Sequence, residues 1–210
     1  MPVINVADQT FPAWCELESF EIVTLTAGGA HTFDRRGQRE KLIVARGHCR
    51  LVSPHDQSLA ERAIVDLDQP SPRFEIRDAV PGTVLVRMAG CWGEETGGAG
   101  LFGVARADDP RDAGDPVAYP KETTFDAHYH DCDEYWIILE GRGTAASEGR
   151  LYEVGPGDCV ATGMGHHHDF PLVAAPVRAV FFETTLEGQK RRGHLWNHTH
   201  GPAEPHPDRI

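Results

Sequence analysis

Paired cysteines are missing from this 210-residue sequence, which has five cysteines and no CxxC motif. A disulfide framework uses an even set of cysteines, and structural zinc sites usually contain CxxC pairs, so the sequence argues against both. The N-terminus also lacks the basic and apolar stretches of a signal peptide. We therefore expect a protein of the reducing cytoplasm.

Basic residues are also in short supply. Lys plus Arg number 20 against 32 Asp plus Glu, which gives a formal net charge of −12 with histidine neutral. An acidic chain repels a phosphate backbone, and the longest basic cluster, Lys190–Arg192, is too short to offset that. Apolar stretches such as Tyr135–Leu139 are far shorter than the roughly 20 residues of a membrane-spanning helix. We expect a small-molecule substrate or ligand, no nucleic-acid partner and no membrane partner.

Long helical patterns are scarce as well. Only Ser58–Asp66 offers a possible helical turn or two, whereas 22 glycines and 15 prolines divide the chain into short segments. Several segments are rich in β-branched and aromatic residues and are bounded by turn residues, which is typical of strands. They are Phe20–Leu25, Lys41–Ala45, Thr83–Arg87, Tyr135–Leu139 and Arg178–Glu183. Many short strands with frequent turns predict an all-β sandwich or barrel.

The sequence resembles itself at a spacing of about 94 residues. Glu40–Gly47 and Glu134–Gly141 each begin with an acid and end with a glycine across an apolar strand, and Pro81 and Pro176 precede matching strands. Two landmarks at nearly one spacing predict duplicated halves. The expected organisation is a first half over 1–92, a linker over 93–115, a second half over 116–190 and an extended tail over 191–210.

Twelve histidines are the unusual part of the composition, and several gather in the second half. Alternate residues of a strand face the same side, so His128 and His130 project together. Glu134 follows across a short turn, and His168 comes from a distant strand after a glycine-rich turn. Three neutral imidazoles and one carboxylate suit one divalent transition metal ion, whether Mn, Fe, Zn, Ni or Cu, and leave coordination positions open.

These residues resemble the two motifs of the cupin superfamily, G(X)5HXH(X)3-4E(X)6G and G(X)5PXG(X)2H(X)3N. His128, His130, Glu134 and Gly141 fit the first motif, and Gly157, Gly165 and His168 fit the second. The resemblance implies a double-stranded β-helix, the cupin jelly-roll barrel, with three histidines and one glutamate as metal ligands: His128, His130, Glu134 and His168. Three positions depart from the motifs, none of them a ligand: Glu122, Gly163 and Leu172.

The first half resembles a degenerate second copy, so the chain resembles a bicupin with one working site. At the spacing of 94 residues, Asp34 and Arg36 stand at the positions of His128 and His130, and only Glu40 of the ligand set is kept. A half that loses its imidazoles is expected to hold no metal. We therefore expect two tandem cupin units and one metal ion per chain.

His166 is a candidate catalytic residue. Strand alternation would place it on the face of His168, where it would line the pocket or replace that ligand, and a loop histidine facing water is an equal alternative. The histidines of the tail have no matching partner set. A cap over the barrel and adventitious metal binding are both open for them, and a solvated segment is the default: His194, His198, His200 and His206.

The cupin fold does not select the reaction. The resemblance leaves a metal-dependent isomerase or epimerase of a sugar or keto acid, an Fe- or Cu-dependent dioxygenase, and a non-catalytic cupin that binds a small ligand. The His-Tyr-His sequence followed by an acid is similar to that of cupin-type sugar-phosphate isomerases, which places the isomerase first. Lys121 is the only basic residue between Arg111 and Arg142, so an unphosphorylated substrate is favoured. Edge strands in such barrels often pair across a two-fold axis, and we expect a homodimer.

Overall fold

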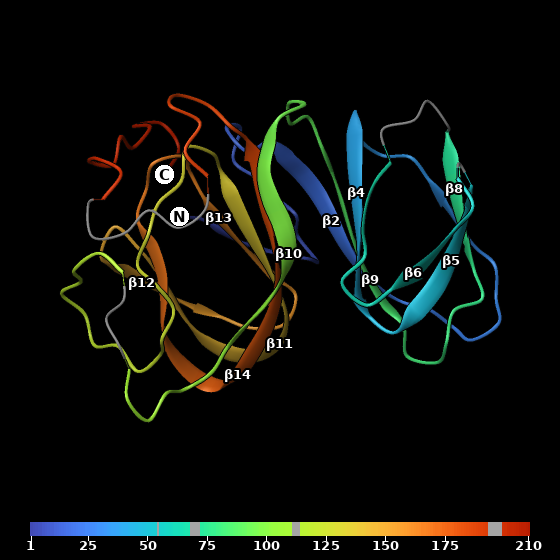
Figure 1. Cartoon of the computed structure of the whole chain (residues 1–210), viewed down its shortest axis with the longest axis horizontal. Helices are drawn as coiled ribbons and strands as arrows, with labels where there is room; N and C mark the ends of the chain where they lie inside the picture. Colours follow the sequence, from blue (N-terminus) through green and yellow to red (C-terminus); the bar gives the residue numbers. More distant parts are fainter. Residues whose placement is uncertain (54, 68–71, 111–113, 193–198) are drawn as a thin grey trace. The chain divides into compact units, whose positions relative to one another are not determined.

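The computed structural model of this chain describes residues 1–53, 55–67, 72–110, 114–192 and 199–210. In these residues the regular elements are fourteen β-strands with antiparallel pairing (Figure 1). No helix in this part of the chain has the length and hydropathy needed to span a membrane. The all-β class is confirmed, and each predicted strand coincides with or overlaps an observed one.

The strands form two compact units, an N-terminal unit of residues 17–91 and a C-terminal unit of residues 1–16 and 92–210. This division corrects the predicted boundaries of 1–92 for a first half and 93–115 for a linker. β1 (Val3–Asn5) pairs with β13 (Asp158–Thr162), so the first residues complete the C-terminal unit. The stretch interpreted as a linker contains β10 (Thr96–Val104), which pairs with β14 (His168–Thr185).

The C-terminal unit is built on one sheet in the order β1-β13-β11-β14-β10, with β12 (Arg150–Val154) paired to β11 (Glu134–Ser147). The long strands β11 and β14 lie side by side, and shifts in their register allow them to bend (Figure 1). Apolar side chains of these strands, including Trp136 and Phe170, form a buried core. This is the jelly-roll arrangement that the resemblance implied.

The N-terminal unit contains two four-stranded sheets, ordered β2-β9-β4-β7 and β3-β8-β5-β6. The strands are β2 (Leu17–Thr24), β3 (His31–Asp34), β4 (Arg39–Arg46), β5 (His48–Ser53), β6 (Gln57–Ala60), β7 (Ile64–Asp66), β8 (Arg73–Arg77) and β9 (Val84–Gly90). Leu42, Phe74 and Leu85 belong to its buried core. The helical turns expected over Ser58–Asp66 are wrong, because β6 and β7 form there and pair with β5 and β4.

The register of the strands agrees with the predicted internal repeat. Lys41 faces Met88 in the N-terminal unit, and Tyr135 faces Phe182 in the C-terminal unit. Both members of the second pair follow those of the first by the same spacing of about 94 residues that the sequence shows. The description of the units as two tandem cupin domains stays a prediction, and this register supports it.

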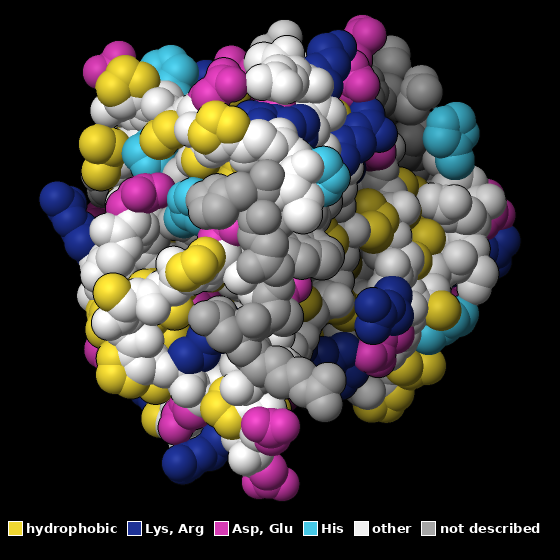
Figure 2. Space-filling model, turned by 60° about the vertical axis from the view of Figure 1, so that its left-hand side comes forward, with side chains coloured by type: hydrophobic (Ala, Val, Ile, Leu, Met, Phe, Trp, Pro, Cys, Tyr) yellow, Lys and Arg dark blue, Asp and Glu magenta, His cyan; other side chains and the backbone are white. Residues whose placement is uncertain are grey.

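Charged side chains of both signs are mixed on the surface. On the face shown in Figure 2, several Lys and Arg side chains lie beside acidic ones. Exposed ion pairs of this kind include Arg50 with Asp56 at 2.5 Å and Lys190 with Glu95 at 2.5 Å. The absence of a nucleic-acid partner stays a prediction, which rests on the net charge.

Candidate metal centre

Two predicted ligands meet across a backbone bridge where β14 begins. His128 and His168 exchange two backbone hydrogen bonds, with N–O distances of 3.1 and 2.9 Å. Directly opposed residues of an antiparallel pair project to the same face, and the two ring centroids lie 4.4 Å apart. His130, two positions later, brings its ring centroid to 4.7 Å from that of His128. The structure thus brings together the three histidines that the motif spacing selects.

Glu134 joins this group from the first position of β11. Thr162 of β13 and Glu183 of β14 pair with it on either side. Its Oε2 lies 2.7 Å from His168 Nε2 and 3.3 Å from His130 Nε2. The ligand atoms offered by the four residues all lie within 4.8 Å of one another, and all four residues are buried. One ion could therefore contact the whole set.

Buried polar atoms without hydrogen-bond partners indicate that the cluster suits a cation. Glu134 Oε2 and His168 Nε2 are buried and have no hydrogen-bond partner among the residues described. Burying such atoms is costly unless something satisfies their lone pairs. Imidazole nitrogens with one carboxylate suit first-row divalent ions, so the donor set fits the metal that the fold implies.

Backbone carbonyls set the tautomer of two of the imidazoles. His128 Nδ1 donates to the Asp126 carbonyl at 2.7 Å, and His168 Nδ1 donates to the His166 carbonyl at 2.9 Å. A proton on Nδ1 leaves the lone pair on Nε2, the atom directed to the cluster. In both cases the acceptor lies two positions earlier in the chain, so the local backbone orients the ligand ring.

The electrostatics favour a neutral His128 beside an ionised Glu134. Burial lowers the pKa of His128 well below its usual value, and the neighbouring His168 and His130 lower it further. Burial alone would raise the pKa of Glu134, but the adjacent His130 and His168 imidazoles hold that pKa well below its usual value. These directions favour a neutral His128 and an ionised Glu134, which are the protonation states that metal binding requires.

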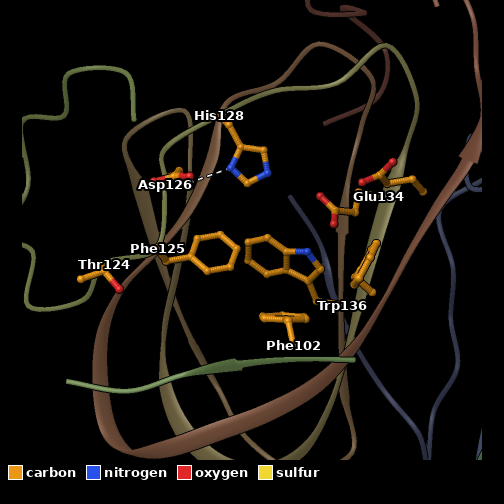
Figure 3. Close-up of a pocket in the computed structure, with 9 residues that line it drawn as sticks. Phe102, Thr124, Phe125, Asp126, His128, Glu134 and Trp136 are labelled. Carbon is orange, nitrogen blue, oxygen red and sulfur yellow. Dashed lines mark hydrogen bonds between the residues drawn. The ribbon is translucent and has the colours of Figure 1, made fainter. Parts of the chain in front are cut away.

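The cluster borders a cavity of about 270 Å³. His128 and Glu134 lie at one end of it, and the rings of Phe125, Trp136 and Phe102 lie beyond them (Figure 3). An ion held by the cluster would have one side facing this cavity. A small molecule in the cavity could therefore reach an open coordination position.

A further carboxylate, Glu183, lines the same cavity and lies outside both motifs. It is 8% exposed, and its Oε1 lies 3.9 Å from His130 Nε2. Burial raises the pKa of Glu183 to about 6, and the charge of Glu134 raises it as well. The feature that identifies Glu183 as part of the site is the register of the strands, because Glu183 of β14 is paired directly with Glu134 of β11. That pairing is known only once the strands have been aligned in space.

His166 lies apart from the cluster. Its Nε2 bonds to the His206 carbonyl at 2.9 Å, its Nδ1 lies 3.7 Å from the Glu148 carboxylate, and it lines a different cavity. Alternation fails here because β14 begins only at His168 and the residues before it form a turn. The structure therefore corrects the two predicted placements of this catalytic candidate, in the wall of the metal pocket and as a replacement ligand. The alternative of a loop histidine facing water is wrong as well, because His166 is buried. Two tail histidines lie outside the described residues: His194 and His198.

The described part of the tail, residues 199–210, packs on the loops that carry the ligands. His206 N donates to the Met164 carbonyl at 3.0 Å, and Arg209 donates to Asp133 Oδ1 at 2.9 Å. Asp133 directly precedes the first residue of β11, so the tail holds the turn that delivers the carboxylate ligand. For this segment the structure favours a cap over a solvated chain.

The tail also explains a departure from the second cupin motif. Gly163 stands where the motif has proline, and a Cβ at Gly163 would overlap the carbonyl oxygen of Arg209. Gly165, which has a φ of 77°, meets the Glu204 carbonyl in the same way. The turn before β14 is therefore shaped to receive the C-terminal segment.

In the N-terminal unit, an arginine binds the carboxylate that the repeat retains. Arg87 donates to Glu40, the counterpart of Glu134, at 2.9 Å, and the two side chains are 3% and 0% exposed. The guanidinium lies 5.8 and 5.2 Å from the ring centroids of Phe33 and Phe74. A fixed internal cation thus balances this carboxylate.

These features define a class of protein, a β jelly roll with a three-histidine, one-carboxylate cation site beside an apolar cavity. Residues 117–183 match the Cupin_2 family, described as a cupin domain. The chain is also 46% identical over 212 residues to "Uncharacterized protein y4oW" of Sinorhizobium fredii, which covers 100% of this chain and 97% of that protein. The chain belongs to the cupin superfamily.

Solved structures share the fold at low sequence identity. AerE from Microcystis aeruginosa is 10% identical, with 79% of this chain and 86% of that chain covered and a TM-score of 0.53. Oxalate decarboxylase from Bacillus subtilis, in a structure concerned with its Mn(II) centres, is 12% identical, with 93% and 74% covered and a TM-score of 0.56. At these identities the likeness shows the fold alone.

Proposed function

We propose that this protein is a metal-dependent cupin enzyme that isomerises or epimerises a small oxygenated metabolite. The observation that carries the proposal is the buried four-residue cluster beside a cavity that contains one more carboxylate, Glu183. The metal ligands in this proposal are His128, His130, Glu134 and His168. When bound, a divalent ion supplies Lewis-acid polarisation of a substrate oxygen.

The protein's own residues supply the remaining chemistry. The Nδ1 hydrogen bonds of His128 and His168 hold their rings in one orientation. Phe125 and Trp136 form an apolar wall that keeps water away from the substrate. Glu183 lies beside the cluster and is the group that would remove a proton from a carbon next to the bound oxygen and return it. Return of the proton to the neighbouring carbon, with transfer of the hydroxyl proton to the former carbonyl oxygen, isomerises the substrate. Epimerisation needs a proton on the opposite face, and solvent would have to supply it.

A second function, an Fe- or Cu-dependent dioxygenase, is favoured by a different observation. The cavity wall is aromatic, with Phe102, Phe125, Trp136 and Phe181 among its lining residues. An apolar cavity accommodates molecular oxygen and protects reactive intermediates from water. The two functions differ in whether oxygen is consumed.

Metal content tests the ligand set. We expect His168→Ala and Glu134→Gln each to lower the metal bound per chain by about tenfold or more, because each removes a donor from a four-ligand site. His167→Ala is the matched control, because His167 is the neighbouring residue but its ring bonds Asp115 at 2.8 Å. Elemental analysis of protein purified from its native host gives the measurement. Full occupancy in both ligand variants would sink the assignment.

Isotope and oxygen measurements test the reaction. We expect deuterium from solvent to enter a turned-over substrate without oxygen uptake, and Glu183→Gln to lose this exchange while it keeps its metal. Stoichiometric oxygen uptake would replace the isomerase with the dioxygenase. Tight ligand binding by the metal-loaded protein with neither reaction would identify a non-catalytic binding cupin, the third expectation from the resemblance.

A homodimer in the cytoplasm stays part of the proposal. Antiparallel sheets that end in unpaired edge strands can pair across a two-fold axis. Sedimentation analysis that gives twice the 23.1 kDa chain mass would support the dimer, and the mass of one chain would refute it.

A further inference from the structure

The wall of the cavity beside the metal centre is aromatic on several sides. Four rings line it: Phe102, Phe125, Trp136 and Phe181. Trp136 meets Phe125 edge-on, with 5.2 Å between centroids and 78° between planes, and lies 5.6 Å from Phe102. Phe102 in turn lies 6.3 Å from Phe181. Because the rings support one another, they form a preorganised apolar surface that suits a flat molecule.

Polar side chains are few in this cavity. Beyond the cluster residues, the polar side chains that line it in the described part of the chain are Thr124, Asp126 and Glu183. A sugar carries a hydroxyl on nearly every carbon, and each hydroxyl buried without a partner costs about 1–3 kcal/mol. The cavity therefore suits a ring with few hydroxyl groups better than it suits a sugar.

The charge of the cavity also restricts what can enter. A divalent ion in the cluster would be balanced by Glu134 and Glu183, and a third acidic residue, Asp126, also lines the cavity. No lysine or arginine lines it among the residues that the structure describes. Arg192 influences Glu183 from outside this lining, and its guanidinium forms an ion pair with Glu95 at 2.8 Å. An anionic substrate would therefore add charge that nothing in the wall balances.

Glycines of β10 create the room for this arrangement. A Cβ at Gly97 would overlap the carboxylate of Glu183, and a Cβ at Gly100 would lie 2.9 Å from the Phe181 ring. Both side chains belong to β14, the neighbouring strand. The glycine-rich segment is therefore part of the cavity, because it allows an acid and a ring from β14 to occupy space that side chains of β10 would otherwise fill.

We propose that the substrate is an uncharged flat ring compound with one oxygen that reaches the metal ion, a neighbouring hydroxyl that donates to Glu183, and few other polar groups. This inference rests on the proposed function and deepens it by naming the substrate class. The proposed substrate class excludes dicarboxylates, phosphorylated compounds and free sugars.

Calorimetric titration of the zinc-loaded protein at about pH 8, where carboxylates are ionised, tests the inference. The probes are salicyl alcohol and salicylate, which share a ring and a phenol and differ only in an alcohol against a carboxylate, with D-fructose as the polyol. We expect salicyl alcohol to bind about tenfold or more tightly than either of the others. Equal or tighter binding of salicylate or D-fructose would overturn the inference.

Variants assign the preference to particular residues. Glu183→Gln removes one negative charge, so we expect the affinity for salicylate to rise relative to that for salicyl alcohol. Glu148 is an acid that lines a different cavity of the same unit, so Glu148→Gln should leave the order of the affinities unchanged. Phe125→Leu should lower the affinity for salicyl alcohol by up to about tenfold, because the contact between the two rings is lost. An unchanged ranking in Glu183→Gln would contradict the assigned role of its charge.

Zinc content, measured on the same samples, separates this inference from the proposed function. Protein that binds no zinc would overturn the proposed function. The titrations would still rank the affinities of the three probes in that protein. Even weaker binding of salicylate is expected there, because the acidic residues of the cavity then lack a balancing ion. Zinc-loaded protein that binds none of the three probes would overturn the substrate class and leave the metal site standing.

Discussion

Single residues show how the two units neutralise one repeated carboxylate in different ways. Glu134 faces imidazole nitrogens that suit a metal ion, whereas Glu40 accepts two hydrogen bonds from the Arg87 guanidinium. Both carboxylates are buried, and a buried charge needs a partner of opposite sign. The N-terminal unit therefore neutralises its buried carboxylate with a cation that belongs to the chain, Arg87. The C-terminal unit is proposed to neutralise its own with a metal ion that can exchange.

Arg87→Met should destabilise the N-terminal unit strongly. Removing one member of a buried ion pair leaves the other charge without compensation, and we expect the free energy of unfolding to fall by about 3–5 kcal/mol. Arg73→Met is the matched control, because its partner Asp34 is exposed and an exposed pair contributes about 0–1 kcal/mol. Urea denaturation measures both variants. Equal losses would show that Arg87 is not acting as a buried counter-ion.

The thiols should differ sharply in reactivity. Burial raises the pKa of Cys15 to about 12 and that of Cys49 to about 11, and it raises the pKa of Cys132 and Cys159 as well. At about pH 8 these groups hold little reactive thiolate. Cys91 is exposed. We expect one rapidly reacting thiol per native chain in an Ellman titration, lost in Cys91→Ser, and five in denaturant. Two or more fast thiols in the native protein would contradict this.

Residue roles could be predicted from the sequence where they depend on spacing along the chain. His128, His130, Glu134 and His168 lie at motif positions, and the structure brings them together. The roles of Glu183 and Arg87 depend instead on which residue faces which across two strands, and neither belongs to a motif. His166 was misplaced because strand alternation was extended into a turn.

At the scale of elements, two segments with no sequence signal for structure support the site. The glycine content of residues 93–115 predicts a linker, yet β10 forms there and pairs with β14 along its length. The tail was expected to be extended, and residues 199–210 pack against the turns on both sides of the cluster. Apolar strand content predicted five strands: β2, β4, β9, β11 and β14. Glycines and tail contacts show no apolar pattern along the chain, because their role depends on which atoms they contact in the folded protein.

Gly163→Ala should disturb the contact between the tail and the ligand loops. The new Cβ would overlap the Arg209 carbonyl, and we expect a loss of about 1–3 kcal/mol in the free energy of unfolding from overpacking. Gly103→Ala is the control, because its Cβ would make an ordinary contact at 3.4 Å. Chemical denaturation of both variants, each with and without residues 199–210, gives the measurement. A loss that persists after removal of the segment would refute the tail contact as its cause.

The whole molecule consists of two units with separate cores. One core contains Leu42 and Phe74, and the other contains Trp136 and Phe170. The sequence predicted this division from its internal repeat but placed its boundary incorrectly, because a short N-terminal strand such as β1 does not indicate which sheet it will join.

Metal should stabilise only one of the units. Binding to the folded state at a free concentration of 100 times the dissociation constant contributes about 2.7 kcal/mol, and we expect this gain in the C-terminal unit alone. Scanning calorimetry with added zinc should move one unfolding transition upward, and elemental analysis should find one ion per chain. A shift of both transitions, or two tightly bound ions, would contradict a single site.

The pairing of β1 with β13 determines the order in which the chain can be completed during synthesis. Residues 17–91 are contiguous and can fold as soon as they leave the ribosome, whereas Asn5 must wait for Asp158, 153 positions later, before it finds its partner. The first residues made are therefore among the last to be placed. The C-terminal unit can be completed only after residues 17–91 have been made, and its metal centre can form only after His168 has been made.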